Sequence, residues 1–194
     1  MPLHPTFPNG WLSRCASSLG LVLAVSRCGG EPSVSVASEA QPTTAASLID
    51  HQLWRVVEVT ADPLATHRPA TVSCDDLTSW GPEAEYVEVD TGRCNYLMIS
   101  QPSLAAGKVG DRVLGRILYF DLTAPEPAEG HVAVLIGTRV IAERTVAIPG
   151  RGDVFAFEEI LTAPLEKGDP VYLHVHNHGQ NNWRLYELAV VPGP

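Results

Sequence analysis

The chain has 194 residues, 45% of them hydrophobic, with 16 Gly and 16 Pro, a length that suits one compact domain plus an additional segment at one end. The 22 acidic residues outnumber the 13 basic ones and give a formal net charge of −9. Nucleic acids and anionic membranes are bound by clustered Lys and Arg, so this charge disfavours both as direct partners.

The first 27 residues have the pattern of an export signal. Residues 15–26 read CASSLGLVLAVS and carry no charge, and Arg14 precedes them. A short apolar run after a positive charge is typical of a signal peptide, whereas a membrane-spanning helix needs about 20 apolar residues. The sequence therefore predicts a signal peptide over residues 1–27 and an exported protein.

Two processing sites are consistent with this signal. Ala24-Val25-Ser26 has the small-x-small spacing of ordinary cleavage, which would release a periplasmic or extracellular protein. Residues 23–28 (LAVSRC) resemble the lipobox of bacterial lipoproteins, which implies lipidation of Cys28 and an outer-membrane lipoprotein. Arg27 departs from that pattern, because lipoboxes normally carry Gly, Ala or Ser before the cysteine. In the lipoprotein alternative, the lipid anchor is the only contact with the membrane.

The residues after Cys28 are small and polar, which predicts a flexible Ser/Ala/Pro/Thr linker over residues 28–50 and a folded domain over residues 51–192. With Cys28 as the anchor, that domain retains two cysteines, Cys74 and Cys94. Exported proteins mature in an oxidising compartment, so we expect a disulfide between them.

From Leu53 onward the apolar residues alternate with polar ones, which is the period of a β-strand. Turn sequences such as Gly137-Thr138 separate the alternating segments. No window of ten or more residues keeps a helical period without Gly or Pro. The expected strands are 53–60, 85–90, 94–100, 112–122, 131–137, 139–148, 153–161, 171–176 and 183–191.

Many short strands joined by tight turns predict an all-β protein with an antiparallel β-sandwich. Eight to nine strands favour a jelly-roll over a seven-stranded immunoglobulin type. The order of the segments and the terminal strand from Trp183 to Val191 resemble the galactose-binding-like jelly-roll of carbohydrate-binding modules, in which the last strand returns beside the first. The resemblance covers residues 53–191 and implies a non-catalytic domain that binds carbohydrate.

The highest density of histidine and amide side chains lies in residues 171–183, VYLHVHNHGQNNW. On a strand, His174 and His176 point to one face, while the apolar residues between them fill the core. With His178, they could bind Zn or Cu if a carboxylate or a fourth histidine joined them. A solvated strand face explains the same residues. His131 is the only other histidine in an expected strand.

The residues after these histidines predict a second kind of site. Amide side chains pair with sugar hydroxyls, and an indole stacks on the C–H face of a sugar. The same residues also suit an ordinary turn. The HVHNHGxNxW segment is similar to segments of predicted bacterial lipoproteins, which implies export but no activity. The expected ligand-binding residues are Asn177, Gln180, Asn181, Asn182 and Trp183.

Catalytic motifs such as G-x-S-x-G, H-E-x-x-H and G-x-x-x-x-G-K-S/T are absent from the sequence. Glu158 and Glu159 are neighbours on an expected strand and face opposite ways, so they cannot flank one glycosidic bond. We therefore expect a non-enzymatic cell-envelope protein that binds a carbohydrate or another envelope partner and needs no cofactor. The alternatives are a Zn- or Cu-binding protein and a purely structural envelope lipoprotein.

Overall fold

The computed structural model describes residues 44–74 and 78–194, all of which belong to the unit Ala40–Pro194. The expected signal peptide, Cys28 and most of the expected linker lie outside the described residues. Among the described residues, no helix has the length and apolar character needed to cross a membrane.

Eleven strands and three short 3₁₀-helices form the described part of the chain. The strands are β1 (Ala46–Ser47), β2 (Arg55–Val56), β3 (Trp80–Pro82), β4 (Val87–Asp90), β5 (Tyr96–Pro102), β6 (Arg112–Tyr119), β7 (Ala128–Ile136), β8 (Arg139–Ile148), β9 (Asp153–Ile160), β10 (Pro170–Asn177) and β11 (Asn182–Val191). The 3₁₀-helices are η1 (His51–Leu53), η2 (Val59–Ala61) and η3 (Ala65–His67).

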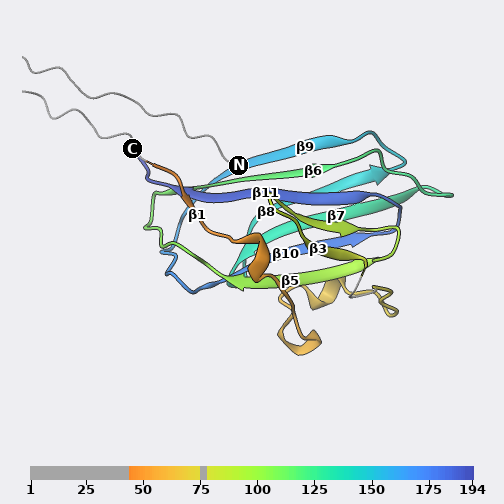
Figure 1. Cartoon of the computed structure of the whole chain (residues 1–194), viewed down its shortest axis with the longest axis horizontal. Helices are drawn as coiled ribbons and strands as arrows, with labels where there is room; N and C mark the ends of the chain where they lie inside the picture. The colour runs from red at the N-terminus through yellow and green to blue at the C-terminus, as the bar shows by residue number, and fades with distance from the viewer. Residues whose placement is uncertain (1–43, 75–77) are drawn as a thin grey trace, which may run out of the picture. The chain divides into compact units, whose positions relative to one another are not determined.

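The strands form two antiparallel sheets that pack into a β-sandwich (Figure 1). Sheet A has the order β3-β4-β11-β6-β9, with β1 also paired to β11, and sheet B has the order β2-β5-β10-β7-β8. The predicted all-β sandwich of the jelly-roll class is therefore confirmed. The predicted hairpin between β7 and β8 also forms, with Gly137 at a φ of 59°.

Two features at the beginning of the domain differ from the sequence prediction. The expected strand over residues 53–60 forms only the two-residue β2 and the helix η2, and Val56 and Val59 are 48% and 55% exposed. The folded domain also begins before the expected boundary at residue 51. Leu48 is fully buried, and Ala46 pairs with Val190 of β11.

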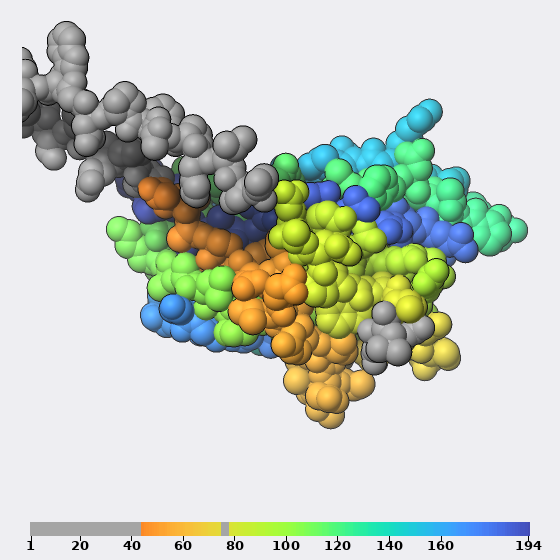
Figure 2. All heavy atoms as spheres, in the orientation of Figure 1, coloured from red at the N-terminus to blue at the C-terminus, as the bar shows by residue number. Residues whose placement is uncertain are grey.

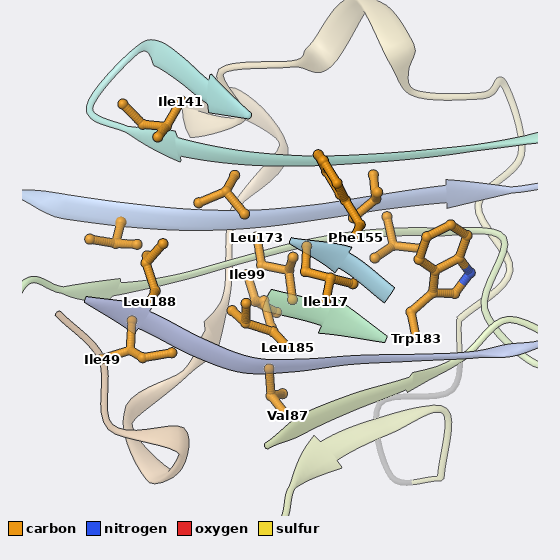
Figure 3. Packing of buried hydrophobic residues seen from close by; sticks show 14 of the residues in the cluster. Ile49, Val87, Ile99, Ile117, Ile141, Phe155, Leu173, Trp183, Leu185 and Leu188 are labelled. Atoms are coloured by element: carbon orange, nitrogen blue, oxygen red, sulfur yellow. The ribbon is translucent and has the colours of Figure 1, made fainter. Parts of the chain in front are cut away.

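The core lies between the two sheets (Figure 3). Leu173 and Val175 on β10 are 3% and 1% exposed, which confirms the inward face predicted for this strand. Leu185 and Ile117 fill the same layer from sheet A. Each fully buried side chain of this size contributes about 1.5–3 kcal/mol of transfer free energy.

A cover segment, residues 57–72, lies against the outer face of sheet B; it is gold in Figure 1 and projects below β5, as the spheres of Figure 2 also show. The backbone N–H of Val57 donates to the carbonyl of Met98, with an N···O distance of 2.9 Å. The predicted disulfide between Cys74 and Cys94 forms beyond the end of the segment. A small apolar cluster holds the segment in place: Val57, Leu64, Val72, Tyr96, Met98 and Tyr172.

Candidate functional site

The loop between β10 and β11 is held by its own asparagines. Asn177 Nδ2 donates to Thr91 Oγ1 at 2.9 Å, and its Oδ1 accepts from the Gly179 N–H at 2.8 Å. Asn181 bonds both backbone groups of Phe120, at 3.0 Å to the N–H and 2.7 Å to the carbonyl. Asn177 and Asn181 are only 1% and 7% exposed, so these amides stabilise the loop and are not presented to a ligand.

Trp183 lies in the core, where it is 1% exposed (Figure 3). Its ring packs on that of Tyr119, and Gly130 leaves the space for it, since an added Cβ there would lie 3.3 Å from the indole Cζ2. This burial corrects the expected role of Trp183, because no sugar can reach the indole. Gln180 is exposed and Asn182 is half-buried. The five residues expected to bind a ligand therefore do not form one accessible site.

The outer face of sheet A carries a group of side chains of which the sequence analysis singled out only Asn182. The guanidinium carbon of Arg184 lies 4.7 Å from the ring centroid of Tyr86 and 4.7 Å from that of Phe120. Arg184 also forms an ion pair with Glu88. We call this surface the Arg184 face; it consists of Tyr86, Glu88, Phe120, Asn182, Arg184 and Tyr186.

Hydrogen bonds fix the polar groups of the Arg184 face. Asn182 Nδ2 donates to Glu88 Oε1 at 2.9 Å, and Arg184 Nε donates to Glu88 Oε2. Burial lowers the pKa of Arg184, the hydrogen bonds to Glu88 and Tyr186 raise it, and the net shift is upward. Arg184 therefore stays charged, and the side chains of Glu88, Asn182 and Arg184 hold one another in place.

Two hollows adjoin this face. An apolar hollow of about 560 Å³ lies beside Phe120 and includes Leu118, Gly152 and Val154. Phe120 and Val154 are each 45% exposed. A polar hollow of about 270 Å³ lies on the other side, and Glu88 is part of its lining. Aromatic, apolar and charged surfaces thus meet within one accessible region.

A second polar group lies on the outer face of sheet B, where the three predicted metal ligands are found. His174 is fully buried, His176 is half-buried and His178 is exposed. The ring centroids of His174 and His176 are 6.5 Å apart, and those of His176 and His178 are 4.6 Å apart. The structure therefore places His174 and His176 on one face, as the strand period predicted, and with His178 they lie along a row rather than around a point.

His174 is closer to two other histidines. His67, His131 and His174 each offer a ring nitrogen, and these three atoms all lie within 4.8 Å of one another. Burial and, to a smaller extent, the neighbouring histidines together lower the pKa of His174 to about 3. His67 comes from the cover segment and has no strand or helix period around it, so no local sequence signal marked it.

Comparisons with known proteins identify similar folds. No family model matches the sequence, and no curated protein matches it either. A solved structure described as "CBM4 structure and function" is 13% identical, with a TM-score of 0.39 over 74% of this chain and 88% of that one. TmCBM61 in complex with β-1,4-galactotriose is 14% identical, with a TM-score of 0.36 over 74% and 97% of the two chains.

A third similar structure contains the CBM22-1 and GH10 modules of the Clostridium thermocellum xylanase 10B, complexed with xylohexaose. It is 8% identical, with a TM-score of 0.37 over 78% of this chain and 28% of that one. These structures are similar in fold alone, and the likeness assigns no ligand to this chain.

Proposed function

We propose that this chain is an exported, non-catalytic β-sandwich that binds carbohydrate on the Arg184 face. The observation that carries the proposal is the position of Arg184 between the rings of Tyr86 and Phe120, on an accessible sheet face. Phe120 remains 45% exposed despite this contact, so part of its ring is open to a ligand.

The chemistry of this face suits a sugar. Exposed rings stack on the C–H face of a pyranose, and Arg, Glu and Asn side chains exchange hydrogen bonds with its hydroxyls. Glu88 already accepts from Asn182 and Arg184, so these groups lose little side-chain entropy on binding. An apolar surface with a few fixed polar groups is the usual composition of a small-molecule site.

Export is part of the same proposal and is supported by the disulfide between Cys74 and Cys94, since such bonds persist in oxidising compartments. Lipidation of Cys28, which lies outside the described residues, would hold the domain at the envelope. A Cys28→Ser variant of the full precursor should then move from the membrane fraction to the soluble fraction. Unchanged partitioning would contradict the lipid anchor. It would not bear on carbohydrate binding by the Arg184 face, which is tested separately.

A glycan array tests the binding function. The purified chain should be retained by at least one polysaccharide, and Phe120→Ala should weaken that retention by about two- to tenfold, because a stacked ring contributes roughly 0.5–1.5 kcal/mol. Arg184→Gln should weaken it as well. Val140→Ala is the matched control, since Val140 is a 39% exposed apolar residue on β8 of the other sheet. Retention by no carbohydrate, or retention unchanged in both variants, would contradict the proposal.

A further inference from the structure

Five histidines gather on the outer face of sheet B, away from the Arg184 face. Three of them, His67, His131 and His174, come from η3, β7 and β10, which are separate in the sequence. Their ring nitrogens lie within 4.8 Å of one another, and the rings of His67 and His131 are stacked with centroids 4.7 Å apart. The fold thus brings three imidazoles together on the outer face of sheet B, outside the hydrophobic core between the two sheets.

His174 is the buried end of this group. Its side chain is 0% exposed, and among the described residues neither Nδ1 nor Nε2 has a hydrogen-bond partner. A buried polar group without a partner destabilises a fold, so an imidazole with neither a hydrogen bond nor a bound metal is unfavourable at this position.

The distances are close to those of a metal centre. Three atoms no more than 4.8 Å apart share a centre within about 2.8 Å of each, and Zn–N bonds are about 2.0–2.1 Å. Each ring nitrogen would therefore move by about 0.7 Å or less, which small rotations of the rings supply. His67 is exposed, so a cation can reach the group from solvent at that side.

Neighbouring residues hold two of the three ligands, His131 and His67, in place. His131 Nε2 lies 3.3 Å from Glu143 Oε2, and its buried Nδ1 has no partner among the described residues. A carboxylate that bonds the second nitrogen of a ligating histidine orients the ring and raises its basicity. Around His67, the cover segment is fixed to β5 by Tyr96, whose hydroxyl donates to Asp62 Oδ2 at 2.6 Å.

We propose that His67, His131 and His174 bind one divalent transition-metal cation of the Zn²⁺ or Cu²⁺ class. Imidazole nitrogen suits these ions, whereas Ca²⁺ and Mg²⁺ prefer oxygen ligands. The fourth coordination position faces the exposed side of His67 and takes water or a further ligand. The cation links the cover segment to the centre of sheet B. This ligand set differs from the one expected from the strand alone, since His67 and His131 replace His176 and His178.

Zinc titration of the purified, EDTA-treated chain tests this assignment. Isothermal titration should give one Zn²⁺ per chain and none for Ca²⁺, and elemental analysis should find the bound metal after dialysis. His67→Gln should weaken Zn²⁺ binding by at least the 10- to 100-fold that loss of a supporting residue causes. His67 is exposed, so this variant should fold, and its unfolding temperature in EDTA should match the wild type.

His178→Gln is the matched control, because His178 is an exposed histidine on the same face. It should leave Zn²⁺ binding unchanged. Failure of the wild-type chain to bind Zn²⁺ or Cu²⁺ would overturn the proposal. So would loss of binding in His178→Gln with retention in His67→Gln, which would assign the metal to the row along β10. Carbohydrate retention is measured separately and does not depend on either outcome.

Discussion

Trp183 and Tyr119 pack ring against ring inside the sandwich, with centroids 4.6 Å apart and planes inclined by 31°. Both belong to sheet A, where Trp183 of β11 pairs directly with Tyr119 of β6. A cross-strand aromatic pair of this kind stabilises a sheet by about 0.2–1 kcal/mol relative to an Ala–Ala pair. Because Trp183 lies at the beginning of β11, its packing against Tyr119 anchors the end of the β10–β11 loop to the core.

Replacing Trp183 tests this structural role. Trp183→Ala should lower the free energy of unfolding by about 3–5 kcal/mol, the range for loss of a large buried ring. Trp183→Phe should lower it less, because most of the apolar volume remains. Urea unfolding of the wild type and both variants measures the difference. An unchanged midpoint for Trp183→Ala would show that the indole is not part of the core.

The disulfide should make a comparable contribution to stability. Cys74 and Cys94 are separated by 20 residues, and closing a loop of that length stabilises the fold by about 3 kcal/mol in the chain-entropy model. A Cys74→Ser/Cys94→Ser double variant should lose about that much in urea unfolding. Mass spectrometry of the unreduced chain provides the direct check. Free alkylation of both thiols without reductant would contradict the disulfide.

Asp111 gives the fold a predictable response to acid. Its carboxylate accepts from the N–H groups of Lys108 at 2.9 Å and Gly193 at 3.0 Å, which lower the pKa of Asp111 below its ordinary value of 3.8. A lowered pKa means that the unfolded chain binds the proton more readily. The stabilisation is therefore complete above the unfolded pKa and is lost as the pH falls through the folded one.

Asp111→Asn should therefore be less stable than the wild type at pH 7, and the difference should shrink in strong acid. Urea midpoints of both proteins at neutral pH and below the unfolded pKa of 3.8 measure it. Glu126→Gln, at an exposed position in the β6–β7 connection, serves as the control. A difference that stays constant over this range would show that the charge of Asp111 is not involved.

Strand alternation predicted the sheet faces well where the strands are long. On β10, Leu173 and Val175 face the core and His174 lies on the opposite face, as expected. The alternation could not show that His174 is buried, because the cover segment that lies over this face is distant in the sequence. The alternative that His174 lies on a solvated strand face is therefore wrong for a tertiary reason.

The residues that the sequence predicted to bind sugar show the opposite case. Trp183 and Leu185 share one face of β11, so the strand period already favoured the core for the indole. The nearby asparagines suggested a binding loop instead. The Arg184 face was not predictable in the same way, because Tyr86, Phe120 and Arg184 meet only through the register of β4, β11 and β6.

The central claim, that the Arg184 face binds carbohydrate, is tested most directly by mapping the contact. An isotope-labelled chain is titrated with soluble xylo-, gluco- and galacto-oligosaccharides while backbone and side-chain chemical shifts are recorded. At least one oligosaccharide should shift the signals of Tyr86, Phe120 and Arg184, with the His174 region unchanged. Shifts confined to Gln180 and its loop, or no shifts with any of the three classes, would contradict the account.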